Sequence, residues 1–300
     1  MSHWRGELRH QVSLANHTSW RVGGPADHLF RPADREDLAT FLAQCEPDEP
    51  LFWLGLGSNL LVRDGGIRGT VIATHGTLNQ IEPLPGGRLR VGVGVASPKL
   101  ARVAARYHLG GLAFLAGIPG SFGGALAMNA GCYGSTTWQW VTRVETIDRA
   151  GRRRWRAGGE YQIGYRQVVA PVSNEWFIAA ELALPEAVAD EQQQIQQLLA
   201  RRRATQPLQQ PNAGSVFRNP EGDHAARLIE SAQMKGRRRG GAMVSDRHAN
   251  FIVNVGGATA ADIEALIDEV REQVLRRHGV VLQPEVRVVG EAMGDASAAA

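Results

Sequence analysis

The sequence of 300 residues contains two cysteines, Cys45 and Cys132. Two are too few for a disulfide framework or for a four-cysteine zinc site, so no metal site is expected. A compartment in which thiols stay reduced is the simpler expectation, and we expect a cytoplasmic protein. The first ten residues contain no apolar run, so no signal peptide is expected.

Lysine is also scarce. Only Lys99 and Lys235 are lysine, which leaves 31 of the 33 basic side chains as arginine, and the net charge is only +3. Two runs of three arginines, at residues 201–203 and 237–239, raise the alternative of a non-catalytic nucleic-acid-binding protein. No nucleic-acid motif accompanies either run. A solvated helix end and a solvated loop explain them better, so no nucleic-acid partner is expected.

Charged residues are absent from Leu109 to Thr142. A membrane helix could have this length, but eight glycines, Pro119 and Asn129 interrupt the stretch, so no membrane insertion is expected. Glycine is abundant in the whole chain, with 35 of 300 residues against a usual share of about 7%. The stretch therefore indicates a buried, glycine-rich loop that approaches a ligand closely.

A second glycine-rich segment, Gly55 to Asn59, follows the apolar strand expected at 51–54. Its glycines would expose backbone N–H groups to a phosphate, although a tight turn between strands is an equal alternative. A Rossmann fingerprint needs a third glycine and a helix, whereas Leu60 begins another strand pattern. No Walker lysine follows the glycines after Gly117. Two glycine segments some 60 residues apart indicate one long ligand with a pyrophosphate, such as a dinucleotide.

Helices and strands alternate irregularly along the chain, and the Gln206–Pro211 segment is typical of a linker. One helix is expected to begin with Ser97 as its N-cap and Pro98 as its first residue. A long C-terminal helix is expected between a cap at Thr259 with Asp262 and a stop at Gly279.

Three further segments have ordinary explanations when each is taken alone. Ser215 lies on a glycine-flanked turn, without the G-x-S-x-G pattern of a hydrolase nucleophile. Arg166 and Glu285 each lie at the end of an expected strand, where surface ion pairing is common.

Taken together, these segments resemble the UDP-N-acetylenolpyruvoylglucosamine reductases, also called UDP-N-acetylmuramate dehydrogenases, of bacterial cell-wall synthesis. They occur in the family's order and span about residues 16 to 290. The chain resembles the shorter class of the family, which lacks an inserted loop that closes over the substrate. The matching stretches are Asn16–Ala26, Gly55–Asn59, Ala116–Gly120, Met128–Gly131, Gly164–Arg166, Asn212–Ser215 and Pro284–Arg287.

The resemblance implies an α+β fold, with a two-lobed FAD-binding domain of the vanillyl-alcohol-oxidase (PCMH) type and a C-terminal α+β substrate-binding domain. The expected ranges are 1–75 and 76–205 for the two FAD-binding lobes and 206–300 for the substrate domain. FAD is the implied tightly bound cofactor, NADPH the co-substrate and UDP-N-acetylglucosamine enolpyruvate the substrate. A flavin oxidase of the same superfamily acting on another small molecule is the second alternative, against which the Asn212–Ser215 and Glu285 segments count.

The resemblance also implies roles for single residues. Ser215 would donate the proton, Arg166 would stabilise the substrate carboxylate as charge develops, and Glu285 would lie at the same carboxylate, where a protonated acid donates a hydrogen bond. The residues implied for FAD are Gly55, Gly57, Ser58, Asn59, Gly120, Ser121, Gly124 and Gly131. Those implied for the sugar nucleotide are Tyr133, Arg203, Asn219, Lys235 and His248.

Overall fold

The computed structural model describes residues 3–294, and its contacts divide the chain into two compact units. Unit 1 consists of Met1–Arg9, Leu29–Leu56 and Gly69–Arg202, and unit 2 of His10–His28, Gly57–Arg68 and Arg203–Ala300. The ranges expected from sequence are contiguous, whereas each unit is assembled from three separate segments. None of the helices within residues 3–294 combines the length and the apolar character that a bilayer crossing requires.

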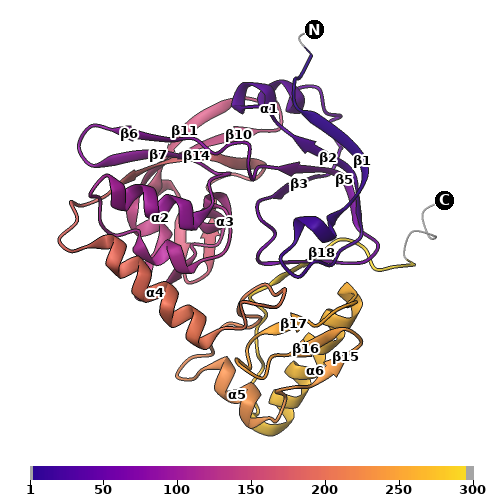
Figure 1. The fold of residues 1–300 in the computed structure, drawn as a ribbon. Helices are drawn as coiled ribbons and strands as arrows, with labels where there is room; N and C mark the ends of the chain where they lie inside the picture. Colours follow the sequence, from indigo (N-terminus) through magenta and orange to yellow (C-terminus); the bar gives the residue numbers. More distant parts are fainter. Residues whose placement is uncertain (1–2, 295–300) are drawn as a thin grey trace. The chain divides into compact units, whose positions relative to one another are not determined.

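The core of unit 1 lies on a five-stranded antiparallel sheet in the order β11-β10-β14-β7-β6. Val144, Ala180 and Val91 lie side by side on neighbouring strands and are fully buried. Two helices, α2 (Ser97–Arg106) and α3 (Phe122–Ala127), cover the sheet and contribute to the same core (Figure 1). The strands are β6 (Ile81–Leu84), β7 (Arg88–Gly92), β10 (Val141–Asp148), β11 (Arg153–Ala157) and β14 (Glu175–Ala183).

Shorter elements of unit 1 carry the loops that matter for function. Two small hairpins, β8 with β9 and β12 with β13, leave the main sheet. The elements are α1 (Arg35–Leu42), η2 (Ala113–Gly117), β8 (Gly131–Cys132), β9 (Ser135–Thr136), η3 (Thr137–Trp140), η4 (Gly158–Glu160), β12 (Gln162–Gly164), β13 (Gln167–Val169) and α4 (Glu191–Thr205).

A four-stranded sheet in the order β1-β2-β5-β3 is built from the first 73 residues. Its strand β3 runs parallel to β5, and Gly55 follows β3 directly. The boundary between the two units falls within three of these strands. The bounds are β1 (Glu7–Ser13), β2 (Pro25–Arg31), β3 (Leu51–Leu54) and β5 (Ile67–Ala73).

Unit 2 has its own core, in which α6 (Ala260–His278) buries one face against the sheet β15-β16-β17 (Figure 1). Strand β18 (Arg287–Val289) pairs with β4 (Leu60–Val62) in parallel. The remaining elements are η1 (Leu14–His17), α5 (Ala225–Ser231), β15 (Arg238–Arg239), β16 (Ala242–Val244) and β17 (Ile252–Asn254). Mostly antiparallel sheets with helices set apart from them make this an α+β protein, as predicted.

Two helix termini test the capping predictions. The long C-terminal helix is confirmed: Thr259 and Asp262 form a capping box, and Gly279 ends the helix in the left-handed region at φ +68°. The prediction for α2 is wrong. Ala96 is the N-cap, whereas Ser97 is the first helical residue and is completely buried.

Candidate functional site

Four of the residues predicted to hold the cofactor form one cluster in unit 1. A Cβ atom on Gly55 would lie 2.2 Å from Oγ of Ser121, so only glycine fits at position 55. Ser121 caps α3, and its Oγ accepts the N–H of Gly124 at 3.3 Å. Gly120 has a φ of +144°, and its carbonyl accepts the N–H of Ser97 at 2.9 Å. Glycine is required here because backbone and a hydroxyl approach one another closely.

One predicted substrate-binding residue and one predicted catalytic residue of unit 1 lie on hairpin turns with unusual backbone angles. Tyr133 lies between β8 and β9 at φ +55°, and Arg166 lies between β12 and β13 at φ +54°. Non-glycine residues in this region are uncommon and store strain, and they cluster at functional sites. Burial raises the pKa of the Cys132 thiol to about 11, and the positive charge of Arg166 acts against that rise, so Arg166 lies within electrostatic reach of the residue before Tyr133.

Asn129, which the sequence placed in a motif without a role, links the same loops. It is buried, has a φ of +40°, and uses both ends of its side-chain amide. Nδ2 donates to the carbonyl of Gly164 at 3.1 Å, and Oδ1 accepts the N–H of Trp138 at 3.1 Å. The end of α3 is thereby tied to the hairpin that carries Arg166.

In unit 2 the backbone brings Ser215, Glu285 and Asn59 together. The carbonyl of Val216 accepts the N–H of Glu285 at 2.7 Å, so the segment after Ser215 is paired with the segment of Glu285. Asn59 donates from Nδ2 to the carbonyl of Glu285 at 3.1 Å, and its own carbonyl accepts the N–H of Arg287 at 3.0 Å. Two predicted catalytic side chains therefore project from adjacent backbone segments.

The neighbouring Gly57 is constrained in the same way as Gly55. Its φ is +60°, and a Cβ atom would lie 2.1 Å from the carbonyl oxygen of His17. Its carbonyl accepts the N–H of Ser19 at 3.2 Å. Ser58 lies between this glycine and Asn59, so the three predicted residues form one turn in unit 2. Gly131, in unit 1, starts β8, where a Cβ atom would lie 2.5 Å from the carbonyl of Ser135.

The four residues of unit 2 that are predicted to contact the nucleotide differ in their burial and in their partners. Lys235, which pairs with Glu230 at 2.8 Å, lies near enough to His248 to act on its charge. Burial lowers the pKa of His248, and the charge of Lys235 adds to this, so the ring is neutral at pH 7. Oδ1 of Asn219 accepts the N–H of Ala225, the first residue of α5, at 3.1 Å. Arg203 is exposed, and its carbonyl accepts a bond from Arg247.

Residues 26–155 match the model of an FAD binding domain family, and residues 206–289 match that of the UDP-N-acetylenolpyruvoylglucosamine reductase C-terminal domain. The UDP-N-acetylenolpyruvoylglucosamine reductase of Alkalilimnicola ehrlichii is 57% identical over 288 residues, covering 96% of each chain. That of Nitrosococcus oceani is 58% identical over the same shares. This chain belongs to the UDP-N-acetylenolpyruvoylglucosamine reductase family. The crystal structure of the Thermus caldophilus reductase, 34% identical, superposes with a TM-score of 0.77 over 95% of this chain and 98% of its own.

Membership in the reductase family brings FAD with it, and unit 1 offers features that fit. The turn after Gly55 packs directly against Ser121 at the start of α3, so two segments predicted to hold the cofactor lie together. Beside it, the hydroxyl of Ser97 is buried and has no hydrogen-bond partner among residues 3–294. Buried polar atoms are nearly always paired, so an unpaired one indicates a missing ligand or water. The residues present therefore fit a bound, polar cofactor.

Two more residues were missed by the sequence analysis of this reductase. Arg202, the neighbour of the predicted Arg203, is half-buried, and burial lowers its pKa while Tyr133 and Cys132 oppose that change. It faces the Tyr133 turn in unit 1, where Arg201 also lies over the Tyr133 ring at 5.6 Å. In unit 2, Asn250 is buried and bonds both the N–H and the carbonyl of Phe217, at 2.9 and 2.8 Å.

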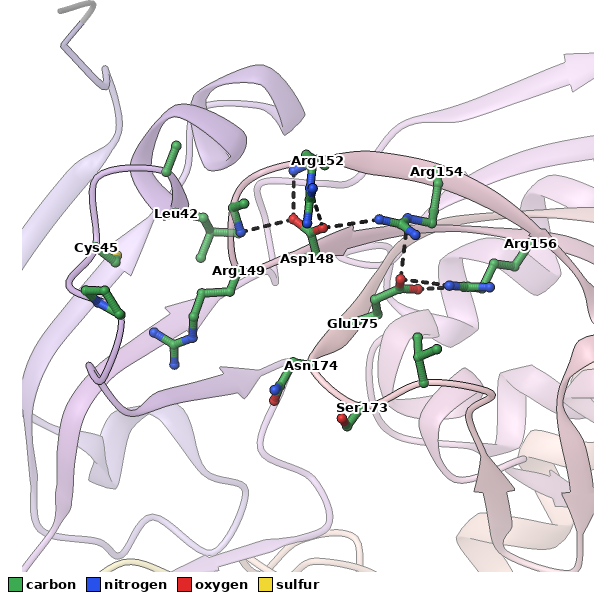
Figure 2. A pocket seen from close by; sticks show the side chains of 14 residues that line it. Leu42, Cys45, Asp148, Arg149, Arg152, Arg154, Arg156, Ser173, Asn174 and Glu175 are labelled. Atoms are coloured by element: carbon green, nitrogen blue, oxygen red, sulfur yellow. Dashed lines mark hydrogen bonds and ion pairs between the residues drawn. The ribbon is translucent and has the colours of Figure 1, made fainter.

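A hollow of about 590 Å³ in unit 1 is lined by four arginines, none of which is predicted from sequence to be functional (Figure 2). Arg152 and Arg154 bind Asp148, and Arg154 and Arg156 bind Glu175. A hydrogen bond from Arg156 lowers the pKa of Glu175. Arg149 donates instead to the backbone carbonyls of Glu46 and Glu49. All four guanidinium groups therefore have partners within the protein, and the lining of the hollow is a structural network.

Proposed function

We propose that this chain reduces the enolpyruvyl ether of UDP-N-acetylglucosamine to UDP-N-acetylmuramate, with tightly bound FAD and with NADPH as the reductant. Near-full-length identity of 57% to a relative named UDP-N-acetylenolpyruvoylglucosamine reductase carries the proposal. It is supported by the backbone pairing that places Ser215 beside Glu285. We assign the reaction to the cytoplasm, where NADPH is available and both free thiols stay reduced.

Bound FAD, once reduced by NADPH, would supply a hydride to the terminal vinyl carbon of the substrate. In unit 1, Gly55, Gly120, Ser121 and Ser97 would hold it by close backbone approach and hydroxyl contacts. Gly124 and Gly131 would lie along the flavin, and Gly57, Ser58 and Asn59 would contribute from unit 2. The proposed division of labour keeps residues 1–75 and 76–205 for FAD and 206–300 for the sugar nucleotide.

Charge and proton transfer are the tasks of the chain's own side chains. Carbanion character develops beside the substrate carboxylate, where the guanidinium of Arg166 stabilises it and Glu285 donates a hydrogen bond in its protonated form. The hydroxyl of Ser215 gives its proton to the carbon that bears the carboxylate, and the resulting alkoxide recovers a proton from solvent. With a pKa of about 11, the thiol of Cys132 remains neutral and takes no part.

The sugar nucleotide is anionic, and cationic or polar groups in both units suit it. Lys235, Asn219, Arg203 and the neutral His248 are proposed contacts for the uridine diphosphate. Tyr133 is a proposed contact in unit 1. Arg202 joins it as a half-buried cation beside the same turn.

The visible absorbance spectrum of the purified protein tests this function. Anaerobic NADPH should bleach a yellow protein, and the enolpyruvyl sugar nucleotide should restore the colour. Bleaching without restoration would leave a flavoprotein that acts on another substrate. A colourless protein that takes up no added FAD would contradict the proposal at its first step.

A further inference from the structure

Asn129 of unit 1 lies at the end of α3 and makes two side-chain hydrogen bonds that the helix end does not require. It ends α3 in a Schellman arrangement: Ala130 N–H bonds Ala125 carbonyl at 2.9 Å, and Asn129 N–H bonds Leu126 carbonyl at 3.3 Å. The residue at this point takes the left-handed region, and glycine is the usual choice. Asparagine is also found at this position, so capping accounts for its backbone conformation but not for the hydrogen bonds of its side chain.

The side-chain amide of Asn129 bonds two other segments of unit 1. Its Nδ2 meets the carbonyl of Gly164, and its Oδ1 meets the N–H of Trp138. A carbonyl only accepts and an N–H only donates, so a single amide orientation satisfies both. One buried side chain thus joins three segments: the end of α3, the start of η3 and the end of β12.

The hairpin that receives this bond carries Arg166 at its turn. Strands β12 and β13 form a separate two-stranded ladder and are largely exposed, and an isolated hairpin of this kind is only marginally stable. Gly164 pairs with Gln167, so Tyr165 and Arg166 form the two-residue turn between them. Arg166 holds a φ of +54°, which its side chain disfavours. The hydrogen bond from Asn129 to Gly164, immediately before the turn, fixes the orientation of the turn and therefore of the Arg166 side chain.

We propose that Asn129 is a positioning residue for the reaction: its amide holds the turn so that the guanidinium of Arg166 meets the substrate carboxylate. This inference rests on the proposed function, because Arg166 acquires its role there. Asn129 touches neither the substrate nor the reacting atoms in this account. Its effect passes through the backbone of Gly164.

The Asn129→Gly variant of the holoenzyme isolates the amide. Glycine keeps the left-handed cap and removes both side-chain bonds. We expect flavin reduction by NADPH at the wild-type rate and reoxidation by the enolpyruvyl substrate slowed about 10- to 100-fold at saturation, since small displacements of a catalytic group have effects of this size. Hydrogen exchange in residues 162–169 should become faster. Gln233→Gly is the matched control, because Gln233 ends α5 in the same arrangement at φ +59° and is exposed.

A double-mutant cycle with Arg166→Ala separates the possible failures. If Asn129 acts through Arg166, Asn129→Gly adds almost nothing in the Arg166→Ala background. Additive losses, or unchanged reoxidation and exchange in Asn129→Gly, would overturn the inference. Wild-type reoxidation by Arg166→Ala would instead refute the role proposed for the arginine. Should Asn129→Gly fail to fold, Asn129→Asp answers the same question: it keeps the bond from Trp138 but, when ionised, cannot donate to Gly164.

Discussion

The two loops that carry the proposed catalytic groups are each fastened by a buried asparagine, but in different ways. In unit 2, Asn250 bonds the N–H and the carbonyl of a single residue, Phe217, as a neighbouring β-strand would. In unit 1, the amide of Asn129 divides its two bonds between Trp138 and Gly164. The first amide completes a local structure, whereas the second connects separate structures.

The two loops also differ in the other hydrogen bonds that hold them. Around Ser215, Val216 also bonds the backbone of Asn250 and of Glu285, and Arg218 N–H bonds the carbonyl of Gln283 at 2.9 Å. The exposed hairpin of unit 1 is a separate ladder of three residue pairs, and Asn129 bonds the residue immediately before its turn. The comparison teaches that losing Asn250 should mainly reduce stability, whereas losing Asn129 should mainly reduce catalysis.

The largest effect should come from the unit 2 loop itself. Ser215→Ala removes the proposed proton donor and leaves the backbone bonds of Val216 in place. We expect reoxidation by the enolpyruvyl substrate to fall about 10²- to 10⁴-fold, while NADPH still reduces the flavin normally. Stopped-flow absorbance resolves the two half-reactions. Ser231→Ala in α5 is the control, and wild-type reoxidation in Ser215→Ala would remove the serine from the mechanism.

The next effect concerns stability and tests the comparison directly. Asn250→Ala leaves the N–H and carbonyl of Phe217 unpaired in a buried site, which should lower the free energy of unfolding by about 3 kcal/mol. Urea unfolding of both variants provides the measurement. Asn129→Gly should lose less, because glycine is the better cap and offsets part of the lost bonding. An equal or larger loss for Asn129→Gly would erase the distinction between the two asparagines.

A smaller effect, which depends on pH, concerns stability. The main sheet of unit 1 is stabilised by buried ion pairs, whereas the two loops are held by side-chain amides. Glu181 is 1% exposed and binds Arg143 and Arg90 at 2.8 and 2.9 Å. The hydrogen bond from Arg143 is the main reason that its pKa is lowered. A lowered pKa stabilises the fold above the unfolded value of about 4.3, and that gain disappears as the pH falls through the folded value.

Glu181→Gln should therefore reduce the free energy of unfolding by about 2 kcal/mol at pH 7, and the gap to wild type should narrow below about pH 4. Chemical unfolding at both pH values measures it. Glu82→Gln is the matched control, because Glu82 binds the same Arg90 from an exposed position, and such pairs contribute about 0–1 kcal/mol. A gap independent of pH would show that the carboxylate charge is not the stabilising feature.

What the sequence could predict follows from how local each signal is. The capping box of α6 and its stop at Gly279 lie within a few residues of the helix, and both are confirmed. Ser97 misled because a serine before a proline fits a cap, while its burial depends on the whole core. The clamps of Asn129 and Asn250 span 35 and 33 residues, and no local pattern reports such bonds. The assigned site roles came from resemblance.

The smallest expected effect is on stability, and it distinguishes the contribution of backbone strain from that of side-chain bonds at the ends of α3 and α5. Gln233 and Asn129 both occupy the left-handed position after a helix, at φ +59° and +40°. Gln233 is exposed, so Gln233→Gly relieves the strain and should raise the free energy of unfolding by about 0.5–1 kcal/mol. Asn129→Gly gains less relief, because asparagine tolerates the left-handed region better than glutamine, and it loses two buried bonds, so its net change should be negative. If both glycine substitutions stabilise the protein equally in thermal unfolding, the Asn129 amide contributes nothing to stability. That result would contradict the proposal that it holds the Arg166 turn.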